Sequence, residues 1–334
     1  MNLVKIFSGN SNRKLAKDIC MSLNVKLGDA LVTRFKDGEV RVQIHENVRK
    51  CEVFIIQSTN PPAEHWDELH FLIDAARRAS ASEITAVVPY FGYSRQERKD
   101  APRVPISLKV KMEHLVASGA QRILTMDLHA GASQGFVDIP VDHLYGPPIL
   151  IDEMSHIIKK KGGQERAVFA SDLGFSKVAS HYARIIGCDF VPCRKSREVN
   201  VVREAEVIGD VSGKTVFYMD DMIDTGGTVT NFCREMKNAG AEDIHVAVTH
   251  AVLGKGWDDM ERGLLGAPVN SLIFTDTILP SPEKLKKIKE KFDVVIASTA
   301  PIFATAIREI SIGGSVGTLF NQWESKMENM GRNG

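Results

Sequence analysis

The feature that most constrains this fold is the regular alternation of short, apolar, β-prone runs with amphipathic helical stretches. In one such stretch, Trp66, Leu69, Leu72, Ile73 and Ala76 fall on a single helical face. The expected strands are Leu3–Phe7, Glu52–Ile56, Ile84–Val88, Arg122–Met126, Ala167–Ala170, Thr215–Met219, Ile244–Val248, Ser271–Phe274 and Val294–Ile296. Alternation of this kind predicts an α/β protein with mostly parallel sheets flanked by helices.

One segment departs from the alternation, and one sequence pattern occurs twice. In Ala30–Ile44, two β-prone runs flank Asp37-Gly38, which predicts a β-hairpin. Ala117–Ile123 leads to His129-Ala130, and 121 residues later Asn238–Ile244 leads to His250-Ala251. Chance is one explanation, because Gly-Ala is common before a strand; duplication is the one we favour. We therefore expect two similar α/β domains, residues 1–146 and 147–321, followed by a polar tail, residues 322–334.

Composition excludes several classes of protein. The 334 residues carry 42 Lys and Arg against 42 Asp and Glu, so bulk charge favours binding to neither nucleic acid nor an anionic membrane. The longest stretch without a charged residue has 14 residues, short of the roughly 20 that a membrane-spanning helix needs. No secretory signal is visible at the N-terminus. The five cysteines are scattered without a Cys-x-x-Cys pair, which favours a reducing, cytoplasmic location.

The segment Val216–Thr228 has the clearest chemical signature. An apolar strand ends in Asp220-Asp221, and a Thr-Gly-Gly-Thr loop then opens a helix. Ligands of open α/β sheets bind at the carboxyl ends of strands. Glycines let the backbone approach a phosphate, and N–H groups at a helix start attract it. The two carboxylates suit the hydroxyls of a sugar. A tight turn with an Asp cap is the alternative interpretation.

These 13 residues match the phosphoribosyl-pyrophosphate (PRPP) binding signature, and other segments narrow the resemblance. They are Phe35–Glu39, Pro89–Lys99, Met126–Ala130, Gln134–Pro140 and Ser171-Asp172. Together they resemble the ribose-phosphate diphosphokinase (PRPP synthetase) family, over residues 8–320. The resemblance implies two phosphoribosyltransferase-like domains, and an enzyme that transfers the diphosphoryl group of ATP to ribose 5-phosphate for nucleotide biosynthesis. It also implies an Mg²⁺ cofactor and a homo-oligomer, with dimers building into hexamers and an adenine site shared between subunits.

The resemblance also implies roles for individual residues. ATP would be bound by Phe35, Asp37, Glu39, Arg95, Gln96 and His129. Ribose 5-phosphate would be bound by Asp220, Asp221, Asp224, Thr225, Gly226, Gly227 and Thr228. His129 and Asp172 would help to bind Mg²⁺. Lys195 and Arg197 would be the catalytic cations of a mobile loop.

Several of these residues also have a purely structural interpretation. His129 could be a structural strand-end histidine, and Asp172 could cap the helix that follows it. Phe35 could belong to the hairpin core, and Lys195 with Arg197 could form a solvated charge cluster. Two other functions stay open: a phosphoribosyltransferase that consumes PRPP, and a catalytically silent subunit that regulates a synthetase.

A second, regulatory anion site is common in the family, and three substitutions here are expected to weaken it. Asn47 and Gly317 stand where the family pattern has hydroxyl residues, and Ala101 stands where it has a cation. We therefore expect weak dependence on free phosphate and weak allosteric inhibition by ADP. The alternative is that the Asn47 amide and backbone N–H groups at Gly317 take over from the lost hydroxyls.

Overall fold

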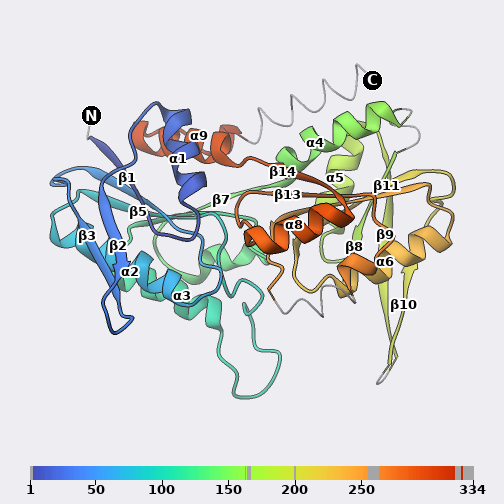
Figure 1. The fold of residues 1–334 in the computed structure, drawn as a ribbon, viewed down its shortest axis with the longest axis horizontal. Helices are drawn as coiled ribbons and strands as arrows, with labels where there is room; N and C mark the ends of the chain where they lie inside the picture. Colours follow the sequence, from blue (N-terminus) through green and yellow to red (C-terminus); the bar gives the residue numbers. More distant parts are fainter. Residues whose placement is uncertain are drawn as a thin grey trace. The chain divides into compact units, whose positions relative to one another are not determined.

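The structure is a computed structural model. It describes residues 3–161, 163, 167–198, 201–254, 263–319 and 325, with backbone only for 195–198 and 201–205. The chain divides into two compact units, each described by itself (Figure 1). Unit 1 comprises Met1–Tyr145 and Thr299–Leu319, and unit 2 comprises Gly146–Ser298 and Phe320–Gly334. The sequence interpretation placed residues 299–319 in the second domain, but their contacts group them with unit 1.

Unit 1 is built on a five-stranded parallel sheet. Its strands are β1 (Val4–Ser8), β4 (Glu52–Ile56), β5 (Glu83–Val88), β6 (Arg122–Met126) and β7 (Val141–Leu144), in the order β1-β4-β5-β6-β7. Helices α2 (Glu64–Arg78) and α3 (Ser107–Ser118) cover one face, and α1 (Arg13–Leu23) and α9 (Ala300–Ile312) the other (Figure 1). A 3-10 helix, Gly131–Phe136, connects β6 to β7. Helix α9 packs against α1 of unit 1, and Ile302, Phe303 and Ile307 of α9 are buried.

The predicted hairpin is present in unit 1. Strands β2 (Ala30–Arg34) and β3 (Val40–Ile44) pair antiparallel, with Ala30 opposite Ile44 and Arg34 opposite Val40. At the turn, Gly38 has φ +97°, a conformation that favours glycine. Alternate residues of the hairpin, including Val32 and Val42, pack against the core formed with α2 and α3. The turn residues 35–39 are exposed.

Unit 2 is built on a seven-stranded sheet in the order β10-β9-β8-β11-β12-β13-β14. The strands are β8 (Ala167–Asp172), β9 (Asp189–Glu198), β10 (Val201–Val207), β11 (Thr215–Ile223), β12 (Asp243–Ala251), β13 (Ser271–Thr275) and β14 (Asp293–Ala297). The helices are α4 (Pro147–Lys160), α5 (Ser176–Ile186), α6 (Gly227–Asn238) and α8 (Pro282–Lys291), with a 3-10 turn at Leu264–Gly266. Two hydrophobic clusters, one with α6 and α8 and one with α4 and α5, cover the two faces of the sheet.

Strand order in unit 2 reverses at β8. From β8 the chain goes through α5 to β9 on one side, and β11 then pairs with β8 on the other side. All neighbours are parallel except β10, which pairs antiparallel with β9. Such a reversal leaves a crevice outside the carboxyl ends of the two strands, where ligands of open α/β sheets bind. Here those strands are β8 and β11.

The repeated sequence pattern corresponds to repeated structure. In unit 1, α3 ends at Gly119 (φ +121°) before β6, and in unit 2, α6 is followed by Gly240 (φ +91°) before β12. In both copies the alanine after the glycine donates its N–H at 3.0 Å to a carbonyl five residues earlier. The expectation of two similar domains, each a mostly parallel sheet flanked by helices, is confirmed.

The nine predicted strands are all present, with bounds that shift by a few residues. Three strands were missed: β7, β9 and β10. Lys195 and Arg197, expected in a mobile loop, both lie in β9, paired with β10. In the part of the chain that the structure describes, no helix has the length and apolar character to cross a membrane.

Candidate active site

Three carboxylates gather where the strand order of unit 2 reverses. β8 and β11 are parallel neighbours, and Asp172 and Asp220-Asp221 lie at their carboxyl ends. The Asp221 N–H donates to Asp220 Oδ1 at 2.9 Å, and Tyr218 Oη donates to Oδ2 at 3.4 Å. Burial, with the nearby carboxylates of Asp221 and Asp172, raises the pKa of Asp220 well above its usual range. A group of acids this crowded suits a ligand that brings hydroxyl donors or a cation.

Asp172 also bonds the turn that leads into α5, but it is not the cap of that helix, whose N-cap residue is Phe175 and which has no side-chain cap. Its Oδ1 accepts the Phe175 N–H at 3.1 Å, just ahead of α5. A carboxylate has two oxygens with about four acceptor positions. The bond to Phe175 is therefore compatible with a second role for Asp172 in ligand binding.

The loop Asp224–Thr228 carries the glycines that the sequence signature predicted. Gly226 has φ +80°, and a Cβ there would lie 2.8 Å from Leu264 Cβ. The α6 helix begins at Gly227 without a side-chain cap, so the first N–H groups of the helix lack the usual side-chain acceptor. Asp224 Oδ1 accepts the Gly254 N–H at 3.1 Å, which holds the loop against the segment after β12. This arrangement suits an anion at the helix start.

The β9–β10 hairpin places the two expected catalytic cations at an irregularity in the pairing. Lys195 lies opposite Ala205 and Arg197 lies opposite Val202, so two residues of β10 face Ser196 alone. A bulge of this kind bends a strand, and bulges are frequent beside active sites. The side chains of Lys195 and Arg197 lie outside the described part of the structure.

Unit 1 carries the residues expected to bind ATP. At the hairpin turn, Phe35 is 50% exposed, so it does not belong to the hairpin core. The Arg41 guanidinium carbon lies 5.4 Å from the Phe35 ring centroid. Asp37 Oδ1 accepts the Glu39 N–H at 3.1 Å and fixes the turn. The hairpin therefore presents an exposed aromatic ring on a rigid turn, which suits stacking against a planar base.

The other expected ATP residues of unit 1 follow β5 and β6. Arg95 and Gln96 are exposed in the segment after β5, and His129 is exposed in the turn after β6. Ser107 Oγ donates to Gln96 Oε1 at 2.6 Å and orients that amide. His143 Nε2 accepts the Leu128 N–H at 2.8 Å, beside His129. Sequence reasoning missed Ser107 and His143, since only spatial proximity links them to the site.

The proposed metal ligands belong to different units. His129 lies in unit 1 and Asp172 in unit 2. Among the residues that the structure describes, no group of three or more His, Cys, Asp or Glu could hold a metal ion. Mg²⁺ commonly keeps several waters and binds through one or two carboxylates together with substrate phosphates. A carboxylate such as Asp172 therefore has the chemistry to bind an ion that arrives with a nucleotide.

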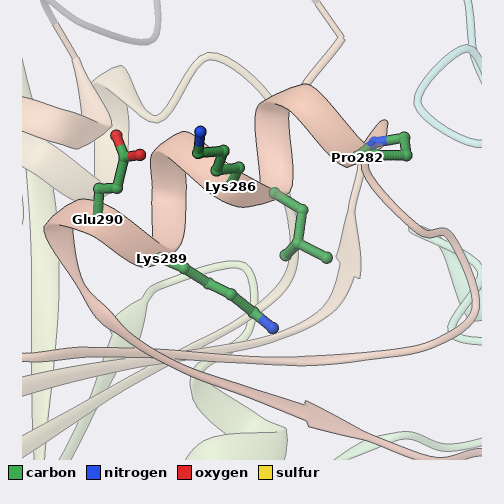
Figure 2. Close-up of a pocket in the computed structure, with 5 residues that line it drawn as sticks. Pro282, Lys286, Lys289 and Glu290 are labelled. Carbon is green, nitrogen blue, oxygen red and sulfur yellow. The ribbon is translucent and has the colours of Figure 1, made fainter.

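A further depression lies on the surface of α8. Its lining residues, Pro282, Leu285, Lys286, Lys289 and Glu290, all belong to this one helix (Figure 2). None of the expected site residues lies there, so we assign no function to it.

Comparison with known proteins places these features in one family. Family models for the "N-terminal domain of ribose phosphate pyrophosphokinase" and the "phosphoribosyl synthetase-associated domain" match residues 4–119 and 175–321. The chain is 42% identical to a ribose-phosphate pyrophosphokinase of Porphyromonas gingivalis, over 96% of this chain and 98% of that protein. The chain belongs to the ribose-phosphate pyrophosphokinase family.

Two further members show how far the similarity extends. A ribose-phosphate pyrophosphokinase of Clostridium tetani is 44% identical over 95% of this chain and 97% of its own length. The crystal structure of phosphoribosylpyrophosphate synthetase from Mycobacterium smegmatis matches with a TM-score of 0.83 and 32% identity, covering 94% of this chain and 100% of that chain. The family resemblance predicted from sequence motifs is thereby confirmed, and it extends well beyond the segment Val216–Thr228.

Proposed function

We propose that this pyrophosphokinase family member transfers the diphosphoryl group of ATP to the anomeric hydroxyl of ribose 5-phosphate. The products are PRPP and AMP. The observation that carries the proposal is the meeting of an acid pair and a glycine loop where the strands of unit 2 reverse, in a chain similar to pyrophosphokinases over nearly its full length.

Unit 2 provides the groups proposed to bind ribose 5-phosphate. Asp220 and Asp221 accept hydrogen bonds from the ribose hydroxyls. The residues Asp224, Thr225, Gly226, Gly227 and Thr228 surround the 5-phosphate. Because Gly226 lacks a side chain, its backbone can turn directly into α6, whose first N–H groups face the anion. Asp224 acts on the loop through its bond with Gly254.

Unit 1 provides the groups proposed to bind ATP. Phe35 stacks against the adenine, and Asp37 and Glu39 border it on the hairpin. Arg95, Gln96 and His129 meet the nucleotide from the ends of β5 and β6. Mg²⁺, held by the ATP phosphates with His129 and Asp172, would supply positive charge that neutralises the triphosphate. ATP recognition is thereby assigned to residues 1–146, and ribose 5-phosphate recognition to residues 147–321.

The transfer step requires two anions to approach each other. The anomeric oxygen attacks the β-phosphorus, the bond from that phosphorus to the α,β-bridging oxygen breaks, the hydroxyl proton is released and AMP leaves. Catalysis of phosphoryl transfer consists mainly of positioning and stabilisation of charge on phosphate oxygens. We assign that stabilisation to Lys195 and Arg197 on the β9–β10 hairpin. Arginine binds phosphate oxygens in a fork, and lysine acts as a point charge.

One assay tests the proposal and separates it from the phosphoribosyltransferase alternative. Enzyme, Mg²⁺, ATP and ribose 5-phosphate should yield AMP and PRPP in equal amounts. Enzyme given PRPP and a free nucleobase should yield no nucleotide. The reverse pattern would contradict the proposal, and no product in either mixture would favour the silent regulatory subunit.

The hairpin turn also supports a site shared between subunits of a homo-oligomer. Phe35, Asp37 and Glu39 are all exposed in the single chain. Mixing Phe35→Ala with Lys195→Ala, each inactive alone, should restore activity, because some sites then combine both intact residues. No recovery in mixed oligomers verified by mass would contradict a shared site.

The cysteines support a reducing, cytoplasmic location. Cys20, Cys51, Cys188, Cys193 and Cys233 are all free and buried. Burial raises the pKa of Cys20 to about 11 and of Cys188 to about 12, which suppresses their reactive thiolate forms.

A further inference from the structure

His143 contacts the turn that carries His129. His143 lies in β7, its side chain is buried, and its Nε2 accepts the Leu128 N–H at 2.8 Å. Leu128 stands between Asp127 and His129, just after β6 ends. The His143 side chain of β7 is therefore hydrogen-bonded to the backbone of the turn that follows β6.

The turn needs such support because its backbone is unusual. Asp127 has φ +39°, a region that residues other than glycine seldom adopt. The Asp127 N–H donates to the Leu144 carbonyl at 3.0 Å. Two successive amides of the turn are thus anchored on β7, one by the backbone and the next by the His143 ring. The residue that follows, His129, is exposed.

The His143 ring is itself packed against an aromatic neighbour. Because Nε2 accepts the Leu128 N–H, the neutral imidazole carries its proton on Nδ1. The Tyr145 ring lies against His143 with 4.8 Å between centroids. An acceptor fixed in this way can determine the position of the Leu128 amide.

We propose that His143 is a positioning residue for His129. By accepting the Leu128 N–H, it fixes the turn and hence the place where the His129 imidazole meets the phosphates of ATP. The inference rests on the proposed function, since it assigns His129 to the nucleotide. A displacement of about 1 Å from productive geometry can cost about 100-fold in rate, so one backbone bond beside a ligand matters.

Two substitutions separate the hydrogen bond from the bulk of the ring. His143→Leu fills much of the space but cannot accept a hydrogen bond. His143→Gln places an amide oxygen near the position of Nε2 and can accept one. His245→Leu is the matched control, because His245 is a buried histidine of β12 that bonds Ser271 at 2.6 Å in unit 2.

The experiment measures steady-state kinetics and amide hydrogen exchange at Leu128. His143→Leu should lower kcat by about 10- to 100-fold. The KM for ribose 5-phosphate should stay within about two-fold of the parent, because that ligand is assigned to unit 2. The Leu128 amide should exchange faster in His143→Leu, and His143→Gln should restore both its protection and most of kcat. His245→Leu should change neither.

Specific results would overturn the positioning role. One is a folded His143→Leu with parental kcat, and another is an equal loss of kcat in His143→Leu and His245→Leu. If His143→Leu does not fold, His143→Gln decides: a protected Leu128 amide with parental kcat supports the role, and a protected amide with a large loss of kcat contradicts it. A parent that forms no PRPP contradicts the proposed function itself.

Discussion

The two units share a strand arrangement but differ in what they present at the strand ends. The order β4-β5-β6-β7 of unit 1 corresponds to β8-β11-β12-β13 of unit 2. After β5 comes a segment with the exposed side chains Arg95 and Gln96, whereas after β11 comes a loop of glycines and backbone N–H groups. At this position, unit 1 therefore exposes polar side chains, whereas unit 2 exposes backbone N–H groups.

The repeated histidine shows the same divergence. His129 is exposed after β6, while its counterpart His250 is 1% exposed in β12, with Nδ1 2.8 Å from Thr277 Oγ1. The two histidines occupy matching sequence positions, but His129 is exposed and is proposed to contact a ligand, whereas His250 is buried in the core of unit 2. The chain path differs as well, because unit 1 adds β4 to β7 in one direction and unit 2 reverses at β8. Two units with similar packing can therefore differ in the chemistry at their strand ends.

The largest expected effect concerns the β9–β10 hairpin, whose antiparallel strand β10 has no counterpart in the sheet of unit 1. Lys195→Ala should lower kcat by about 100- to 1,000-fold, the usual loss when one donor to transition-state charge is removed. Nucleotide affinity should change little, since the cation acts as charge develops. Lys177→Ala, an exposed cation on α5, is the control. A Lys195→Ala enzyme within about three-fold of the parent would remove this residue from the mechanism.

Each unit has a glycine with positive φ at a turn, Gly226 in unit 2 and Gly38 in unit 1, and replacing each by alanine compares how strictly the two turns require glycine. Gly226→Ala should destabilise the protein by about 2–4 kcal/mol, because left-handed strain adds to a clash with Leu264. Gly38→Ala, at the hairpin turn, has φ +97° but no neighbour within 4 Å, so only about 1 kcal/mol is expected. Thermal or denaturant unfolding measures both. Equal losses of unfolding free energy in the two variants would show that Leu264 does not restrain the loop Asp224–Thr228.

The crowded acids of unit 2 should make stability depend on pH. The raised pKa of Asp220 means that the folded protein holds this proton more tightly than the unfolded chain does. Its favourable contribution is therefore complete below the ordinary aspartate pKa and is lost as pH rises through the folded-state value. Asp220→Asn should flatten that decline and stabilise the substrate-free protein at neutral pH, while weakening ribose 5-phosphate. An unchanged pH profile of unfolding would contradict this account of the acid cluster.

The smallest expected effect is regulatory and involves unit 1. Asn47 Oδ1 accepts the Arg49 N–H at 3.0 Å, so this oxygen serves the local turn. With Asn47, Ala101 and Gly317 in place of two hydroxyls and a cation, phosphate should activate weakly, and saturating ATP should relieve inhibition by ADP. Asn47→Ser should strengthen phosphate activation by a few-fold, as about one hydrogen bond would. Strong phosphate activation of the parent, with ADP inhibition that ATP does not relieve, would show an intact second site.

Features that depend on a short stretch of sequence could be predicted. Apolar runs gave the nine strands, Asp37-Gly38 gave the hairpin, and Val216–Thr228 gave the acid pair with its glycine loop. β9 was missed because its second half, with Arg194, Lys195 and Arg197, lacks the apolar character of a buried strand. Pairing with β10 at the sheet edge stabilises it instead.

Features that depend on tertiary neighbours could not be predicted. Nothing in the sequence of α9 indicates that it packs on unit 1 rather than on the domain that precedes it. Ser107 and His143 act through residues 11 and 15 positions away, across turns whose geometry only the fold defines. The positions that orient a site were therefore harder to find than the residues proposed to touch the ligand.

The central claim is that unit 1 binds ATP and unit 2 binds ribose 5-phosphate. Calorimetry with two variants tests this claim most directly. In the presence of Mg²⁺, Asp221→Asn should weaken ribose 5-phosphate by about 10- to 100-fold, the worth of a hydrogen bond to a charged group. Its ATP affinity should stay close to that of the parent. Arg95→Ala should do the opposite, weakening ATP and sparing ribose 5-phosphate. If Asp221→Asn instead abolished ATP binding and left ribose 5-phosphate unchanged, the two substrates would be assigned to the wrong units.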